Sequence, residues 1–175
     1  NGDKLMTDES RLKISVLIAD DHQMIQDMMS SLIQASPDFV VYTASDYDDT
    51  VRILRDGPNI DIVLLDVNMP GNVNGHSIKQ LVDEFPNTSV VVFSGNAPYH
   101  YVSGALKDGA RGYIPKSMPF KSLLNAIRLI VSGEIFVPAD VQSQMLASQQ
   151  NSGFGLTDDE QAVLDKLCDG SSNKD

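Results

Sequence analysis

The chain has 175 residues, 42% of them hydrophobic and 21% charged, which is enough to bury one ordinary globular core. Its formal net charge of −11 argues against nucleic-acid binding through a broad basic face. No apolar run approaches the roughly 18 residues of a membrane span, so no membrane partner is expected. The single cysteine, Cys168, cannot form an internal disulfide, which fits a cytoplasmic location.

Short apolar runs alternate with segments of helical periodicity up to about residue 132. Strands are expected at ISVLIA (14–19), FVVYTA (39–44), IDIVLLD (60–66), SVVVFSG (89–95) and GYIPK (112–116). Helices are expected over 20–34, 46–56, 76–85, 99–109 and 120–133. Because the strands are too apolar to have a solvent-exposed face, the pattern predicts a doubly wound α/β fold, in which helices cover both sides of a five-stranded parallel sheet.

Within the first helix, apolar residues keep the spacing of one helical face, and we expect them to pack on the sheet: Met24, Ile25, Met28, Met29, Leu32 and Ile33. The pair Met28 and Met29 is interpreted as core filling. The three histidines lie near separate helices without the paired spacing of a zinc site, so we expect surface or helix-end positions for His22, His76 and His100.

Polar residues fall where the predicted strands end, the edge at which open α/β sheets bind ligands. Asp20 and Asp21 follow the first strand, Asp66 ends the third, and Ser94 and Lys116 belong to the fourth and fifth. Clustered carboxylates repel one another, and a hard divalent cation such as Mg²⁺ relieves that repulsion. A carboxylate nucleophile, a metal, a lysine and a hydroxyl together suit phosphoryl transfer to an aspartate.

Taken singly, each of these residues has a simpler interpretation. An aspartate after a strand is often a helix cap or turn former, and Asp21 is expected to cap the first helix in part. Ser94 belongs to an ordinary turn sequence, Ser-Gly-Asn, and a lysine beside a proline is usually solvated. Their joint position on one sheet edge favours a site.

In order and spacing, these residues resemble a two-component response-regulator receiver domain of the NarL/FixJ/LuxR type. The resemblance covers roughly residues 12–132 and rests on DD after the first strand, D-x-x-M-P-G after the third, S-G after the fourth and K at the fifth. It implies a flavodoxin-like fold with strand order 2-1-3-4-5, and Asp66 as the acceptor of a phosphoryl group from a histidine kinase or phosphotransfer protein. It further implies Mg²⁺ ligation by Asp21, Asp66 and the carbonyl of Asn68, with Asp20 contributing directly or through water. Ser94 and Lys116 would bind the phosphoryl oxygens.

By the same resemblance, Tyr113 matches a switch aromatic, whose ring would swing inward when Ser94 moves toward the phosphoryl group. The alternative interpretation is that Tyr113 is a half-buried strand residue whose ring keeps one position. Two departures stand out. Gly75 lies one residue further from Asp66 than in the usual pattern, so the loop after Pro70 is expected to bulge. Ser117 replaces the common proline after Lys116, and we still expect a cis bond there, at a cost of roughly 3 kcal/mol.

The alternation of apolar runs and helical segments ends near residue 132. Residues 1–11 are interpreted as a leader, 12–132 as the receiver, and 133–155 as a linker with a helical segment. Residues 156–175 resemble the opening of a helix-turn-helix output domain, with a capping box at Thr157 and Glu160 and the recognition helix beyond Asp175. DNA would therefore be bound only by the complete output domain, and phosphorylation would promote a homodimer.

Two alternative functions remain open. A Mg²⁺-dependent phosphohydrolase with an aspartyl-phosphate intermediate would want an acid two residues after Asp66, where this chain has Asn68. A pseudo-receiver would serve only as an interaction module that is never phosphorylated. The complete set of site residues favours a signalling phosphoacceptor over the phosphohydrolase and the pseudo-receiver. The chain is therefore not expected to be a metabolic enzyme.

Overall fold

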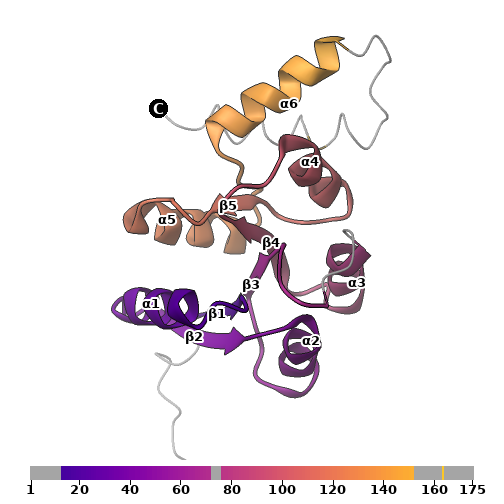
Figure 1. The fold of residues 1–175 in the computed structure, drawn as a ribbon. Coiled ribbons are helices and arrows are strands. Elements are labelled where there is room, and N and C mark those ends of the chain that lie inside the picture. The colour runs from indigo at the N-terminus through magenta and orange to yellow at the C-terminus, as the bar shows by residue number, and fades with distance from the viewer. Residues whose placement is uncertain (1–12, 72–75, 152–162, 164–175) are drawn as a thin grey trace, which may run out of the picture.

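The computed structural model describes residues 13–71, 76–151 and 163 of the chain. Its centre is a parallel five-stranded sheet in the order β2-β1-β3-β4-β5, which confirms the predicted topology (Figure 1). The strands are β1 (Ile14–Ala19), β2 (Phe39–Ala44), β3 (Ile62–Asp66), β4 (Ser89–Ser94) and β5 (Tyr113–Pro115). The short apolar run proposed as a fifth strand is therefore an edge strand of the sheet.

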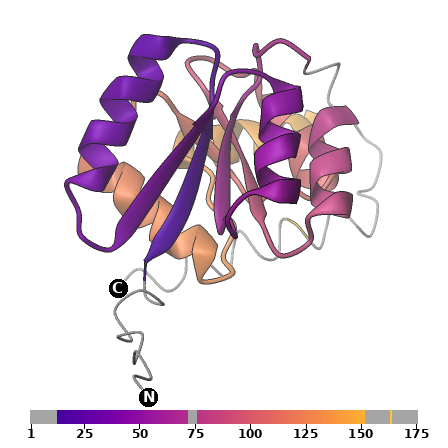
Figure 2. The ribbon, with the colours of Figure 1, turned by 90° about the horizontal axis from the view of Figure 1, so that it is seen from below.

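Helices cover both faces of this sheet. One face carries α1 (Gln23–Gln34) and α5 (Phe120–Val131), and the other carries α2 (Tyr47–Asp56), α3 (His76–Glu84) and α4 (Tyr99–Lys107). Figure 2 shows α1 and α5 on one side of the strands and α2 and α3 on the other. Successive strand residues alternate between the two cores. Leu17 and Leu65 pack in the cluster on the α2–α4 side, whereas Ile18 and Leu64 pack in the cluster under α1 and α5.

The first helix corrects one expectation about its buried face. Met29 and Ile33 are buried, but Met24, Met28 and Leu32 are 80%, 48% and 39% exposed. The prediction that Met28 fills the core is wrong, because α1 is rotated so that Gln26 also points inward. The Gln26 side-chain amide donates to two strand-end carbonyls, those of Asp20 and Ala44. Two apolar stripes run side by side along this helix, and periodicity alone does not choose between them.

The predicted linker contains α6 (Ala139–Asn151), which joins the α2–α4 side of the domain. Val137, Val141 and Met145 are buried there. Phe136 forms a parallel bridge with Gly112, and its backbone bonds to Arg111 and Tyr113 extend the pairing at β5. The helical segment thus packs on the α/β core. Residues 1–11 and most of 156–175, where we expected a leader and an output domain, lie outside the described residues, as does the loop ending at Gly75.

No helix in the described part of the chain combines the length and the apolar character that crossing a bilayer requires.

Candidate functional site

The carboxyl ends of four strands bring polar side chains together. Asp20 directly follows β1, Asp66 and Ser94 are the last residues of β3 and β4, and Lys116 directly follows β5. The register makes these ends neighbours, since Asp66 pairs with Phe93 and Ser94 pairs with Pro115. Asp20, Asp66 and Ser94 are at most 1% exposed. Two buried carboxylates at one sheet edge need compensating positive charge.

Lys116 supplies part of that charge. Its Nζ lies 2.6 Å from Asp20 Oδ2 and 3.2 Å from Asp66 Oδ2, and its side chain is only 18% exposed. Burial alone would lower the pKa of Lys116, but the hydrogen bond to Asp20 and the charges of both carboxylates raise it above its usual value. Burial likewise would raise the pKa of Asp20, but bonds from Lys116 and His22 hold it below the usual range. The lysine is therefore charged and held between the two acids.

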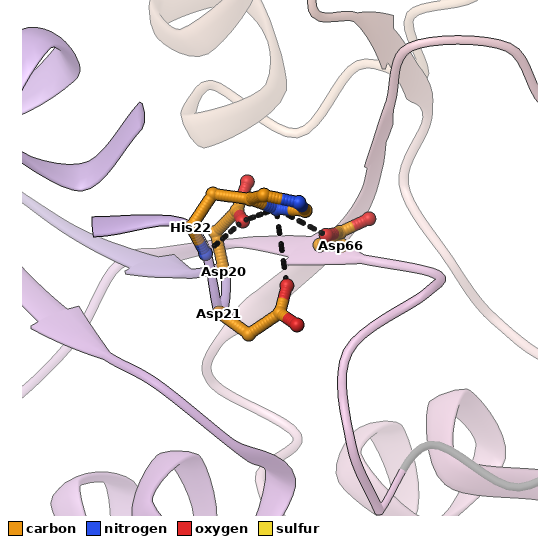
Figure 3. A group of neighbouring side chains, drawn as sticks. All are labelled: Asp20, Asp21, His22 and Asp66. Carbon is orange, nitrogen blue, oxygen red and sulfur yellow. Dashed lines mark hydrogen bonds and ion pairs between the residues drawn. The ribbon is translucent and has the colours of Figure 1, made fainter. Parts of the chain in front are cut away.

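His22 lies at the start of α1 with a side chain 61% exposed, as expected, but the sequence interpretation did not place it beside the acidic residues. Its Nδ1 lies 2.8 Å from Asp20 Oδ1, 3.1 Å from Asp21 Oδ1 and 3.9 Å from Asp66 Oδ2. Figure 3 shows these interactions converging on one ring nitrogen. The hydrogen bond to Asp20 and the charges of Asp21 and Asp20 raise the pKa of His22. The available signal was its position directly after two aspartates at a strand end, rather than any spacing to another histidine.

Asp21 and Asn68 line the more open side of the site. Asp21 has a side chain 34% exposed and faces His22. Asp21 was expected to cap α1 in part, but the N-cap residue of this helix is His22, and the His22 side chain makes no capping hydrogen bond. The backbone N–H of Asn68 donates to Asp66 Oδ1 at 3.2 Å, so the turn after β3 holds one oxygen of that carboxylate while Lys116 faces the other.

Ser94 and Tyr113 complete the set of predicted residues. Among the described residues, the buried Ser94 hydroxyl has no hydrogen-bond partner. A buried hydroxyl without a partner is uncommon, since leaving it unpaired costs about 1–3 kcal/mol, so it is available to an incoming oxygen. The Tyr113 ring is 5% exposed and packs in the cluster on the α2–α4 side. The side chain is therefore buried, and its role as a switch stays a prediction.

The bond between Lys116 and Ser117 is trans, because the described chain contains no cis peptide. The expectation of a cis bond is wrong. A non-proline cis bond costs about 3–4 kcal/mol. The turn after β5 closes without one, through a hydrogen bond of 3.0 Å from the Met118 N–H to the Pro115 carbonyl.

The donor set suits a divalent cation. Asp20, Asp21, His22 and Asp66 each offer one ligand atom, and these atoms all lie within 4.8 Å of one another. Carboxylate oxygens are the ligands that Mg²⁺ prefers. Three carboxylates face one lysine and one histidine, so the site retains net negative charge that a cation would neutralise.

Comparisons with known proteins agree with this arrangement. A family model described as the response regulator receiver domain matches residues 16–128. The transcriptional regulatory protein DesR of Bacillus subtilis (strain 168) is 30% identical over 164 residues, covering 93% of this chain and 78% of that protein. The transcriptional regulatory protein DegU of Brevibacillus brevis is 29% identical over 184 residues, covering 93% and 78%.

A solved structure gives the same result. The crystal structure of a LuxR family DNA-binding response regulator from Silicibacter pomeroyi superposes with a TM-score of 0.64 at 32% identity, covering 73% of this chain and 98% of that one. The match of the family model spans more than half of the chain. The relatives are regulators of signalling and transcription rather than classical enzymes. The chain therefore belongs to the response regulators of two-component systems, with homologues of the LuxR/NarL/FixJ type and a receiver domain at residues 16–128.

Proposed function

We propose that Asp66 accepts a phosphoryl group from a histidine kinase or phosphotransfer protein, in a reaction that requires Mg²⁺. The observation that carries this proposal is the environment of the Asp66 carboxylate. It is buried at the end of a central strand, with one oxygen bonded to the Asn68 N–H and the other 3.2 Å from Lys116 Nζ. A carboxylate held in this way is oriented for attack, and a cation beside it can bind the incoming group.

In the proposed reaction, an Asp66 oxygen forms a bond to phosphorus while the bond from phosphorus to the donor nitrogen breaks. The donor imidazole leaves with that electron pair. Lys116 exchanges its contact with Asp66 for a phosphoryl oxygen, and Ser94 donates its unpaired hydroxyl to another. Asp20, Asp21, Asp66 and the Asn68 carbonyl would hold the metal. When bound, Mg²⁺ would neutralise the charge that develops on the phosphoryl oxygens.

The consequence for the whole protein is a shift between two states of the receiver. Movement of Ser94 toward the phosphoryl group would favour one position of the Tyr113 ring and alter the surface formed by α4, β5 and α5. We infer that this change promotes a homodimer and controls a DNA-binding output domain that begins near residue 156. The names of the relatives, which are transcriptional regulators, support this reading. The kinase reaction would take place in the cytoplasm.

Light scattering after size exclusion tests the proposal on the whole chain. Incubation with a small acyl phosphate and Mg²⁺ should convert wild type from monomer to dimer, and Asp66→Asn should stay monomeric. Asp83→Asn makes the same substitution at an exposed acid of α3 and should behave as wild type. A dimer that forms equally with Asp66→Asn, or without donor and Mg²⁺, would favour an interaction module that does not depend on phosphorylation.

A further inference from the structure

His22 lies in the acidic site without being held there by packing. Its side chain is 61% exposed, and it makes no capping bond to α1. Its ring nitrogen nevertheless points at three carboxylates that come from the ends of β1 and β3 (Figure 3). The orientation of this ring therefore depends on the charged pocket itself, and the imidazole is part of the donor set that faces any bound cation.

The separations between donor atoms fit the edges of one coordination sphere. Adjacent ligands at about 2.1 Å from an octahedral ion lie about 3.0 Å apart, and opposite ligands about 4.2 Å apart. His22 Nδ1 lies 2.8 Å from Asp20 Oδ1 and 3.1 Å from Asp21 Oδ1, which are values for adjacent ligands. Its separation of 3.9 Å from Asp66 Oδ2 approaches that of opposite ligands. One ion can reach all four atoms with small movements of side chains.

We propose that His22 Nδ1 is a fourth side-chain ligand, and that the site consequently prefers a first-row transition-metal dication to Mg²⁺. This inference rests on the metal-dependent function proposed above and adds to it the relative affinity of the site for different cations, while Mg²⁺ remains the ion of the proposed reaction. Mg²⁺ favours oxygen ligands and retains water, whereas imidazole suits ions such as Ni²⁺, Co²⁺ and Zn²⁺. Asp20, Asp21 and Asp66 alone would serve either class of ion. The nitrogen of His22 is what separates the two.

A competing interpretation is that His22 only pairs with Asp20 and Asp21, and that any incoming cation displaces it. The two interpretations differ in what removal of the ring does. If the ring is displaced, His22→Ala makes binding of every divalent cation easier to a similar degree. If the ring is a ligand, His22→Ala weakens binding of nitrogen-preferring ions selectively. The printed ion pairs of the ring are with carboxylates of the site, and the side chain is 61% exposed, so its removal should leave the packing of α1 on the sheet intact.

Calorimetric titration of the whole untagged chain with Ni²⁺ and with Mg²⁺ tests this proposal. These two ions share octahedral geometry but differ in their affinity for nitrogen. Wild type should bind Ni²⁺ more tightly than Mg²⁺. Loss of even an outer-shell partner typically lowers metal affinity about 10–100-fold, so His22→Ala should weaken Ni²⁺ binding by at least about tenfold. Its affinity for Mg²⁺ should stay equal or increase.

The matched control is His100→Ala, which removes an exposed imidazole at the start of α4, outside the site. It should leave both affinities unchanged. The inference is overturned if His22→Ala leaves Ni²⁺ binding unchanged, or if it changes the binding of both ions by the same factor. Mg²⁺-dependent phosphorylation of Asp66, measured on the same samples, separates this result from the proposed function. Phosphorylation that persists while Ni²⁺ selectivity is missing refutes only the role of His22, whereas wild type that neither binds Mg²⁺ nor becomes phosphorylated refutes the function.

Discussion

Replacing Lys116 with methionine should strongly destabilise the metal-free protein. Lys116→Met keeps most of the length of the side chain and removes the charge that lies 2.6 Å from Asp20 and 3.2 Å from Asp66. Each of these contacts contributes several kcal/mol of Coulomb attraction at an effective dielectric constant of about 20. Breaking a buried ion pair by removing one partner costs about 3–5 kcal/mol, because a charge is left buried and uncompensated. His22 still faces Asp20, so we expect about 3 kcal/mol.

Urea denaturation at pH 7 in the presence of a chelator measures this cost. The matched control is Lys79→Met, because Lys79 lies 3.2 Å from Asp83 on the exposed surface of α3, with both side chains at least 60% exposed. Surface pairs of this kind contribute about 0.3–0.5 kcal/mol. The reasoning is refuted if Lys116→Met costs no more than Lys79→Met. Saturating Mg²⁺ should also recover part of the loss in Lys116→Met, since a cation bound to the native state alone stabilises it.

Three further predictions concern the scaffold around the site. Gly112→Ala should lower the free energy of unfolding by more than about 2 kcal/mol, because the added Cβ would lie 2.2 Å from the Phe136 carbonyl oxygen. Gly104 in α4 has open space around it, so Gly104→Ala should raise the free energy of unfolding by about 0.5–1 kcal/mol. Equal effects in urea denaturation would contradict this. Gln26→Leu should cost about 1–3 kcal/mol by the same assay, since two strand-end carbonyls lose their donor, and a neutral result would show that they find another. Because the pKa of Asp20 lies below its usual value of 3.8, the ionised carboxylate stabilises the fold above that pH, and this contribution should be lost as the pH falls through the native pKa. Asp20→Asn should therefore flatten this part of the curve of urea midpoint against pH. An unchanged slope would argue against the assignment.

Much of the fold follows from local sequence patterns. The strands are continuous apolar runs, and helices between them leave a parallel sheet covered on both faces as the only consistent arrangement. The same logic brings Asp20, Asp66 and Lys116 together, because each directly ends or follows a strand and parallel strands end on one edge. Neither inference needed any knowledge of side-chain contacts.

What escaped prediction depends on contacts between distant segments. In the sequence, His22 is indistinguishable from an ordinary helix-end residue. Only the fold brings the Asp66 carboxylate, at the end of β3, to 3.9 Å from the His22 ring nitrogen. The buried face of α1 was misjudged because Met28 and Met29 belong to neighbouring apolar stripes. A polar residue, Gln26, decides between them by bonding to carbonyls at the ends of β1 and β2.

The mass of the intact protein after incubation with a small acyl phosphate tests the central claim most directly. Wild type with Mg²⁺ should gain the mass of one phosphoryl group, and neither chelated wild type nor Asp66→Asn should gain it. An unmodified wild type that remains folded and binds Mg²⁺ would contradict the assignment of Asp66 as a phosphoacceptor. An adduct that survives in Asp66→Asn would show that a different residue receives the group.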